Sequence, residues 1–209
     1  IQGLALTGLD PRTDFCIAFA AVATLLLALW IDRVWGEPPA AWHSVVWMGQ
    51  YLDLCGRIST RFQPVAAFLA GAVAWWAGVV CVGFLASFVQ VLAFRQIAAV
   101  AAAPGFVSAV SSVLLLVALS WLLKTMLSWR MLRSETLAVE FALQQSLEAG
   151  RSRLSMLVSR DTSELGESEV RESAIESLAE NLNDSVVAPV FWFLVFGLPG
   201  AAIYRFANT

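Results

Sequence analysis

The sequence predicts an all-α integral membrane protein with about four membrane helices and one polar helical segment before the last of them. Two observations carry this prediction. The composition is 59% hydrophobic and only 14% charged, with a mean hydropathy of +0.73, whereas an ordinary soluble domain has about 25% charged residues. The apolar residues also gather in four long runs, more than a soluble helical protein of this size could bury.

Each of the four runs approaches the length of a membrane-spanning helix, which needs roughly 20 apolar residues and at least about 17. The runs are Phe15–Ile31, Val65–Phe94, Phe106–Leu123 and Val186–Ile203. The fourth contains Pro189 and the sequence Gly197-Leu198-Pro199-Gly200. We therefore expect a broken helix, which is tolerated at membrane depth where protein or a wet cavity surrounds it. The alternative is a re-entrant or surface-lying segment without a role.

A signal peptide is the alternative interpretation of the first run. Two acidic residues, Asp10 and Asp14, precede this run, whereas a signal peptide begins with a basic region. Trp30, Asp32 and Arg33 follow it without a small-residue cleavage site. A retained span is therefore the better interpretation.

Positive charges predict the orientation in the membrane. Ten of the thirteen lysines and arginines fall in two polar segments, residues 32–64 and 124–185. The three on the opposite side are Arg12, Arg95 and Arg205. By the positive-inside rule both polar segments are cytoplasmic. The chain then divides into a membrane region 1–123 with a short cytoplasmic loop 32–64, a cytoplasmic helical segment 124–185, and a C-terminal membrane region starting with 186–209.

The polar segment is predicted to form two helices. Apolar residues at helical spacing predict the first over Leu122–Leu147, with Gly150 as its stop. The second is predicted from about Ser168 to Leu182. Both helices would pack through one apolar face and leave the other in water.

An acidic row on the second helix is the strongest candidate site. Glu172, Glu176 and Glu180 recur every four residues, and Asp184 continues the row. Like charges at this spacing repel by roughly 0.2–0.5 kcal/mol per pair. The row is either a solvated acidic face or a set of oxygen ligands for a hard cation such as Mg²⁺, which usually also binds phosphate oxygens.

Several function classes find no support in the residues. The net charge of −3 gives no reason to expect a nucleic-acid partner. The cysteines Cys16, Cys55 and Cys81 have no CxxC spacing and no paired histidine, which argues against a metal site or a disulfide. His43 is the only histidine. A histidine in such a tryptophan-rich loop is more often a structural hydrogen-bonding residue than a catalyst.

Short motifs recur in one order along most of the chain. They are Asp32-Arg-Val-Trp-Gly-Glu-Pro38, His43 with Val46–Gly49, Arg160-Asp161-Thr162, Glu176-Ser-Leu-Ala-Glu-Asn181, Asp184, Val187-Ala-Pro189, Gly197-Leu-Pro-Gly-Ala201, Tyr204 and Asn208-Thr209. In this order they resemble the adenosylcobinamide-phosphate synthases of cobalamin biosynthesis, the CbiB/CobD family. Two departures from the family pattern are Glu37 in place of Asp and Ser44 in place of Pro.

The resemblance implies a multi-pass protein of bacterial inner membranes with a site facing the cytoplasm. The implied reaction is ATP-dependent amide formation between adenosylcobyric acid and aminopropanol phosphate, with Mg²⁺. The implied catalytic residues are Glu176, Glu180, Asp184 and His43. Substrate or ATP binding would fall to Arg160, Asp161, Thr162, Asn181, Asp32, Glu37 and Asn208. Metal binding would fall to Asp161, Glu180 and Asp184.

Two other functions stay open at this stage. One is a membrane sensor related to the AmpE proteins of β-lactamase regulation, and the other is a scaffold for corrinoid enzymes. Membrane lipid is an expected partner in every case, and a homo-oligomer or association with other corrinoid-assembly enzymes is left open. Because the chain opens with Ile1 and not Met, we expect residues to be missing before it. Comparison with the family pattern leads us to expect missing residues near Gly150 and after Thr209 as well.

Overall fold

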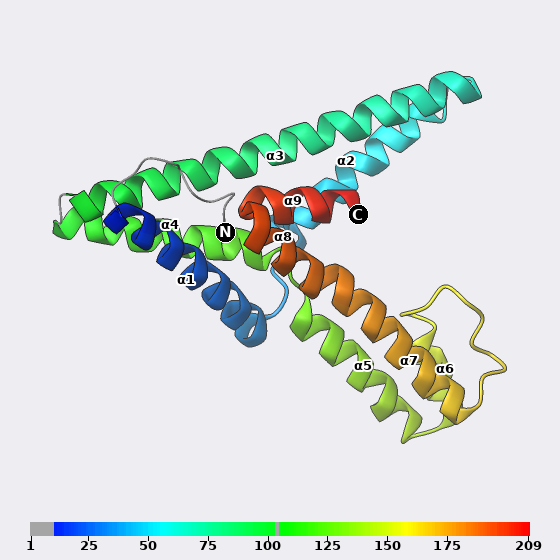
Figure 1. Cartoon of the computed structure of the whole chain (residues 1–209). Coiled ribbons are helices and arrows are strands. Elements are labelled where there is room, and N and C mark those ends of the chain that lie inside the picture. Colours follow the sequence, from blue (N-terminus) through cyan, green and yellow to red (C-terminus); the bar gives the residue numbers. More distant parts are fainter. Residues whose placement is uncertain (1–10, 103–104) are drawn as a thin grey trace.

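A computed structural model describes residues 11–102 and 105–209, and in these residues every element is helical (Figure 1). The predicted all-α class is thereby confirmed. The elements are α1 Pro11–Trp35, a 3₁₀ turn Ala40–Trp42, α2 Ser44–Ser59, α3 Pro64–Ala102, α4 Phe106–Lys124, α5 Trp129–Leu143, α6 Leu147–Leu154, α7 Glu167–Leu182, a π-helical turn Asn183–Val187, α8 Ala188–Phe196 and α9 Leu198–Ala207.

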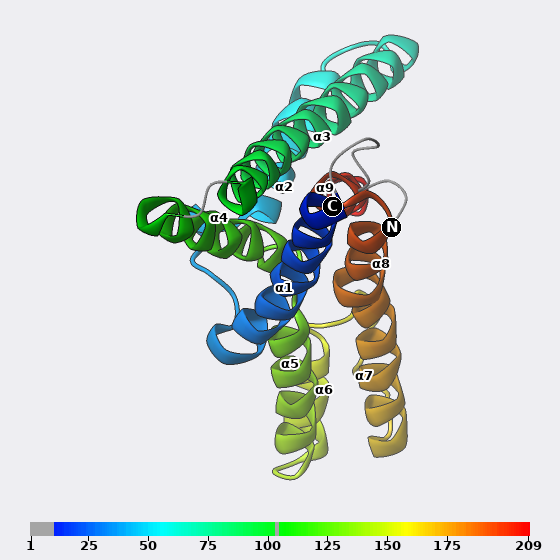
Figure 2. The same cartoon turned by 60° about the vertical axis from the view of Figure 1, so that its left-hand side comes forward.

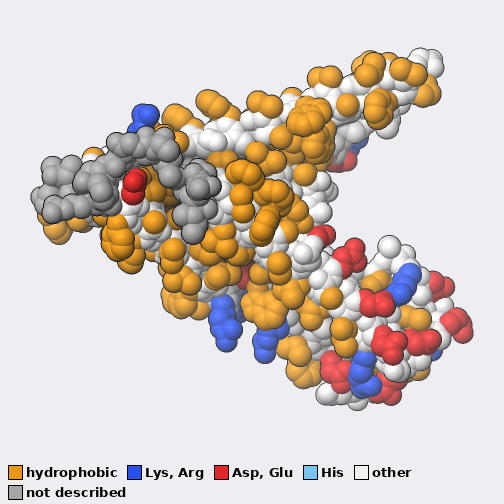
Figure 3. Space-filling view, viewed as in Figure 1, with side chains coloured by type: hydrophobic (Ala, Val, Ile, Leu, Met, Phe, Trp, Pro, Cys, Tyr) orange, Lys and Arg blue, Asp and Glu red, His pale blue; other side chains and the backbone are white. Residues whose placement is uncertain are grey.

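Among the described residues, three helical stretches are long and apolar enough to cross a membrane: Asp14–Trp35 in α1, Pro64–Val100 in α3, and Phe106–Leu143, whose apolar part is α4. They pack on one another through buried small and aliphatic residues such as Ala28, Ala93 and Leu123. Small residues let membrane helices approach closely. The outward faces are also apolar: Phe19 and Phe84 are more than 60% exposed, and hydrophobic atoms cover most of this part of the surface (Figure 3). Such faces suit contact with lipid.

The fourth apolar run does not form one spanning helix. It folds into α8 and α9, of 9 and 10 residues, which pack against each other. At 1.5 Å per residue each is about 15 Å long, half the hydrocarbon thickness of a bilayer. The chain turns at Gly197, whose φ of +72° favours glycine. The Leu198 amide there donates to Gln90 Oε1 of α3 at 2.6 Å.

This turn overturns the predicted position of Arg205. Instead of lying across the membrane, its Nη1 donates to the Asp184 carbonyl at 3.2 Å and to Ser185 Oγ at 3.1 Å. The reason is that α9 folds back along α3, where Phe206 packs between Tyr51 and Trp75. The expected count of four spans is therefore not confirmed.

The predicted helix Leu122–Leu147 is in fact two helices. The chain leaves α4 after Lys124, and α5 begins at Trp129. The Ser128 amide between them donates to the Ser185 carbonyl at 3.1 Å, a tertiary bond that the periodicity could not reveal. Gly150 does not stop a helix but lies inside α6. A glycine is needed there because a side chain would overlap Leu143 where α5 and α6 pack.

Residues 32–64 are more than a loop, because they contain α2. This helix runs back along the first half of α3, and Tyr51 Oη donates to the Ala74 carbonyl at 2.7 Å. Together α2 and the start of α3 project away from the other helices (Figures 1 and 2). The polar helices α5, α6 and α7 form a separate bundle at the other side, with its own small core of Val139, Leu143, Leu154, Val170 and Ala174.

Candidate functional site

Ionisable side chains from distant parts of the chain meet where α1 and α4 end. We call this group the ionic cluster; its members are Asp32, Glu37, His43, Lys124 and Arg205. Asp32 lies in the last turn of α1, Glu37 and His43 lie in the connection to α2, and Lys124 is the last residue of α4. Arg205 comes from α9 and lies within the electrostatic reach of Glu37. Four segments of the fold are therefore needed to build the cluster.

Lys124 is the centre of the ionic cluster. Its Nζ lies 3.3 Å from Asp32 Oδ1 and 3.2 Å from Glu37 Oε2. The side chains of Lys124 and Asp32 are 0% and 1% exposed. Asp32 Oδ2 also accepts from the Arg130 amide at 3.1 Å, at the start of α5. Buried charges are tolerated when they are paired and hydrogen-bonded, so this pair fixes the end of α1 against the junction of α4 and α5.

Glu37 joins Lys124 to His43. Its Oε2 accepts from Lys124 and lies 2.9 Å from His43 Nε2. Burial by itself raises the pKa of Glu37, but the hydrogen bond from His43 and the charge of Lys124 outweigh it, so the pKa lies below its ordinary value. Glu37 is therefore ionised at neutral pH and orients His43 so that Nε2 carries the proton.

Several buried atoms of the ionic cluster have no hydrogen-bond partner among the described residues. They are Glu37 Oε1, His43 Nδ1, Arg205 Nε and Asp32 Oδ1. Asp32 Oδ1 faces the Lys124 ammonium without the alignment of a hydrogen bond. Unsatisfied buried polar groups cost about 1–3 kcal/mol each and in native structures call for an explanation. A ligand that offers both donors and acceptors would satisfy them.

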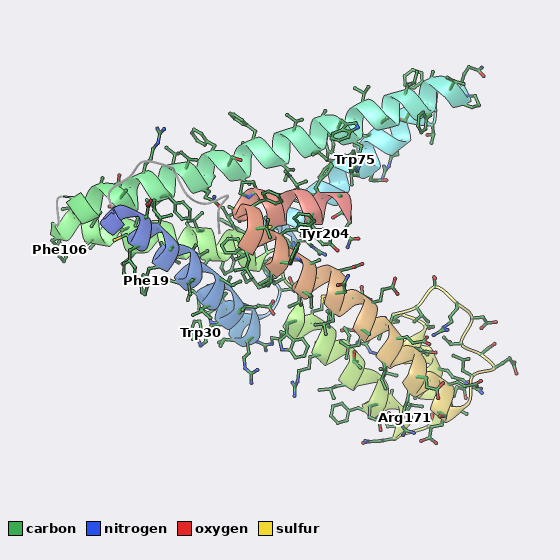
Figure 4. The ribbon with its side chains drawn as sticks, in the orientation of Figure 1. Phe19, Trp30, Trp75, Phe106, Arg171 and Tyr204 are labelled. Carbon is green, nitrogen blue, oxygen red and sulfur yellow. The ribbon has the colours of Figure 1, made fainter. Side chains whose placement is uncertain are left out.

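Asp184 borders the ionic cluster from the π-helical turn between α7 and α8. Its Oδ1 accepts from Tyr204 Oη at 3.3 Å and from Asn183 Nδ2 at 3.0 Å. Tyr204 lies on α9, one residue before Arg205 (Figure 4). Single π-helical turns inside α-helices are frequent at functional sites. The turn here brings the end of the acidic row next to the buried charges.

Two other acidic-row residues, Glu176 and Glu180, lie in a different place. A surface pocket of about 370 Å³ on α7 is lined by Arg160, Glu176, Glu180 and Asn181, together with Leu157, Val158, Ser159, Ser173 and Ser177. We call it the α7 pocket. The guanidinium of Arg160 pairs with the Glu176 carboxylate at 2.6 Å, which offsets part of the repulsion along the row. The structure thus divides the predicted site residues into two groups.

Three predicted residues line neither the cluster nor the pocket. Thr162 is buried, and its hydroxyl donates to the Arg151 carbonyl. Asp161 accepts from the Ser163 amide at 2.9 Å, and hydrogen bonds from Ser163 hold its pKa below the ordinary value. Asn208 is exposed at the end of α9. Their predicted substrate-binding roles stay predictions.

The predicted metal ligands Asp161, Glu180 and Asp184 are not brought together. Over residues 11–102 and 105–209, no group of three or more His, Cys, Asp or Glu side chains is arranged to hold a metal ion. A site built only from protein carboxylates therefore does not fit this arrangement. Mg²⁺ usually binds through one or two carboxylates plus substrate phosphates, so a magnesium role for these residues stays a prediction.

Sequence reasoning missed Lys124 and Arg205 as site residues. Lys124 is the only lysine in the chain and directly follows an apolar run of 18 residues. An ionisable group in or next to a span is a functional candidate by default, so this signal was available. Arg205 gave no such signal, because its position depends on the turn at Gly197.

The fold and the site define a class: an all-helical membrane protein with a buried ionic cluster where its apolar helices end. Residues 25–209 match the protein family described as CobD/Cbib protein. The chain belongs to this family.

Relatives from distant organisms agree with this assignment. The "Probable cobalamin biosynthesis protein CobD" of Pyrococcus furiosus is 39% identical over 186 residues, which are 89% of this chain and 58% of the relative. The protein of the same name from Methanothermobacter thermautotrophicus is 38% identical over 90% of this chain and 56% of the relative. The "Cobalamin biosynthesis protein CobD" of Dehalococcoides mccartyi is 32% identical over 88% of this chain and 56% of the relative. The chain thus spans a little over half the length of these relatives, and no solved structure matches it.

Proposed function

We propose that the chain acts in cobalamin biosynthesis as an ATP-dependent amide ligase that joins adenosylcobyric acid to aminopropanol phosphate and forms adenosylcobinamide phosphate. Family membership supports the pathway, since the relatives carry cobalamin-biosynthesis names. The observation that carries the site is the set of unpartnered donors and acceptors in the ionic cluster. A bound ligand accounts for these atoms, whereas a scaffold that binds no small molecule gives no reason to keep them without protein partners.

The chemistry requires activation of a carboxylate. In the simplest route a carboxylate oxygen attacks the terminal phosphorus of ATP, ADP leaves, and the amine then displaces phosphate from the acyl carbon. The arrangement of Glu37 and His43 suits the second step, because Glu37 fixes the Nε2 proton and leaves Nδ1 free to take the proton of the attacking amine. The free Nε–H of Arg205 suits binding of an anionic oxygen.

The α7 pocket is the proposed place for the nucleotide phosphates. Arg160 and Asn181 supply donors there, and Glu180 lies four residues before Asp184 on the same continuous helix. Mg²⁺ would be held by Glu180, Asp184 and the ATP phosphates, and when bound would screen the phosphate charge. Asp161 and Asn208 would contact the substrate or ATP from outside the α7 pocket and the ionic cluster. Thr162 would only position the loop, because its hydroxyl is already bonded to Arg151.

The proposed location is the bacterial inner membrane, with both charged groups on the cytoplasmic side where ATP is present. The bias of lysine and arginine supports this orientation. Cysteine substitutions at the exposed residues Ser163 and Ser168 test it. We expect both to resist a membrane-impermeant reagent in intact cells and to react after the membrane is opened.

The experiment for the proposed function is product formation by the purified protein in nanodiscs. Mg-ATP should be consumed only when corrinoid and aminopropanol phosphate are both present, with one ADP per amide. His43→Ala should lower the rate at least about tenfold without loss of the folded protein. ATP turnover that ignores both substrates, or none at all, would favour the sensor or scaffold.

A further inference from the structure

A second charged site lies outside the ionic cluster, on the outer side of the junction between α1 and α5. A pocket of about 430 Å³ there is lined by Arg33, Val34, Trp129, Arg130 and Arg133. We call it the arginine pocket. The three arginines are exposed. Basic side chains stand at the lower border of the apolar surface in this region (Figure 3).

None of these three guanidinium groups pairs with a carboxylate among the described residues. Four other described arginines do, namely Arg57, Arg153, Arg160 and Arg171, and the rest do not. What distinguishes the arginine pocket is that three unpaired guanidinium groups line one hollow. The one acceptor found for the three is the Val34 carbonyl, which takes a hydrogen bond from Arg130 Nη1. Three like charges in one hollow repel one another and raise the local positive potential. An anion in the pocket would relieve this repulsion.

The side chains that line the pocket favour a phosphate group. Arginine presents a planar fork of donors that matches phosphate oxygens, and such charge-assisted bonds are the stronger ones in proteins. Carboxylates are also accepted, but three separate forks exceed what two carboxylate oxygens can use. The pocket is therefore better matched to an ion with three or four oxygens.

The neighbours of the arginine pocket indicate that it lies at the membrane surface. Arg33 follows the apolar run of α1, near Trp30 (labelled in Figure 4). The side chains of Trp30 and Trp35 are 55% and 66% exposed. Exposed tryptophans beside arginines mark the level of lipid headgroups. A phospholipid headgroup and a soluble phosphate compound share the chemistry that this pocket recognises.

We propose that the arginine pocket binds the phosphate group of an anionic ligand at the membrane surface. This site is independent of the ligase proposal, since it uses none of the residues given roles there. It is nevertheless linked to the ionic cluster through two neighbouring contacts. Arg33 adjoins Asp32 in the chain, and the Arg130 amide donates to Asp32 Oδ2. A bound phosphate would hold the end of α1 against α5.

Two probes separate the sources of the phosphate: short-chain phosphatidylglycerol and inorganic phosphate. Binding of each to the detergent-solubilised protein is measured by calorimetry at low salt, with short-chain phosphatidylcholine as the zwitterionic control. The double variant Arg33→Gln/Arg133→Gln should bind the preferred probe at least about tenfold more weakly, the effect of losing hydrogen bonds to a charged group. The matched variant Arg61→Gln removes an exposed arginine on the α2 side and should change nothing.

Each outcome decides the proposal. Binding of phosphatidylglycerol that depends on the arginines, without competition from inorganic phosphate, supports a lipid site. Arginine-dependent binding of inorganic phosphate supports a soluble ligand. Equal affinity in the double variant and the native protein, or no binding of either probe, overturns the proposal. Circular dichroism of the double variant confirms that it keeps its helical fold, so a loss of binding cannot come from unfolding.

Discussion

The ammonium group of Lys124 lies 3.3 Å from the Asp32 carboxylate, and neither side chain has more than 1% of its surface exposed. A buried ion pair of this kind is weak evidence for stability by itself, because the cost of removing two charges from water offsets the attraction. The pair does make each charge depend on the other, because a buried charge is tolerated only while its partner is present.

Replacing Lys124 should therefore be severe. In Lys124→Met, the buried Asp32 carboxylate and the partly buried Glu37 carboxylate lose their cation, and we expect a loss of about 3–5 kcal/mol of folding free energy. Thermal unfolding in detergent measures it. Arg57→Gln is the matched control, since the pair of Arg57 with Asp53 is 74% and 59% exposed and its loss should change the melting temperature little.

A second variant tests whether the stability loss in Lys124→Met comes from the unpaired carboxylate charge and not from the changed shape of the side chain. Adding Asp32→Asn to Lys124→Met removes one of the two stranded carboxylates and should recover part of the lost stability. A double variant no more stable than Lys124→Met alone would mean that Asp32 is not the residue that Lys124 neutralises.

The pH dependence of stability should report on Glu37. Its pKa in the folded protein lies below the ordinary value of 4.5, so its ionised form stabilises the fold above that pH. This contribution disappears as the pH falls through the folded pKa. In Glu37→Gln, the stability difference from the native protein should shrink as the pH falls below about 4.5. Glu164→Gln, an exposed loop carboxylate, should show no such change, and a constant difference at all pH values for Glu37→Gln would contradict the assignment.

The turn at Gly197 should not tolerate a side chain. A Cβ there would overlap the Gln90 amide, and the φ of +72° is unfavourable for any other residue. We expect Gly197→Ala to cost about 1–3 kcal/mol of stability. Gly71→Ala is the matched control, because nothing lies within 4 Å of a Cβ at that helical position. If both variants melt at the same temperature, the return of α9 does not depend on this turn.

The acidic row should matter for rate rather than for folding. Glu180→Gln and Asp184→Asn keep size and hydrogen bonding and remove one charge each, and each should slow amide formation at least about tenfold. Both should also shift the magnesium dependence to higher concentrations, which initial rates over a magnesium titration would reveal. Unchanged rates and magnesium dependence in both variants would leave the row as a solvated face.

Hydropathy alone predicted α1, α3 and α4, because a membrane helix needs only length and apolar composition. It could not predict the return of α9, since the turn depends on a bond between Leu198 and Gln90, 108 residues apart. The same limit applies to part of the site. Asp32, Glu37 and His43 were found through motifs, and Lys124 could have been found from its place directly after an apolar run. Arg205 gains its role only from tertiary packing. Because the fourth run looked like a span, Arg205 was predicted on the opposite side of the membrane from Asp184, whereas the structure places its Nη1 against the Asp184 carbonyl.

The ionic cluster also has a consequence for how the protein is made. Its first member, Asp32, leaves the ribosome 173 residues before its last member, Arg205, a delay on the order of ten to thirty seconds at cellular synthesis rates. Until Lys124 arrives, the end of α1 carries two carboxylates with no buried cation. The nascent first span must therefore keep its end in contact with water or with the insertion machinery, and closure of the helical bundle is a late event in biogenesis.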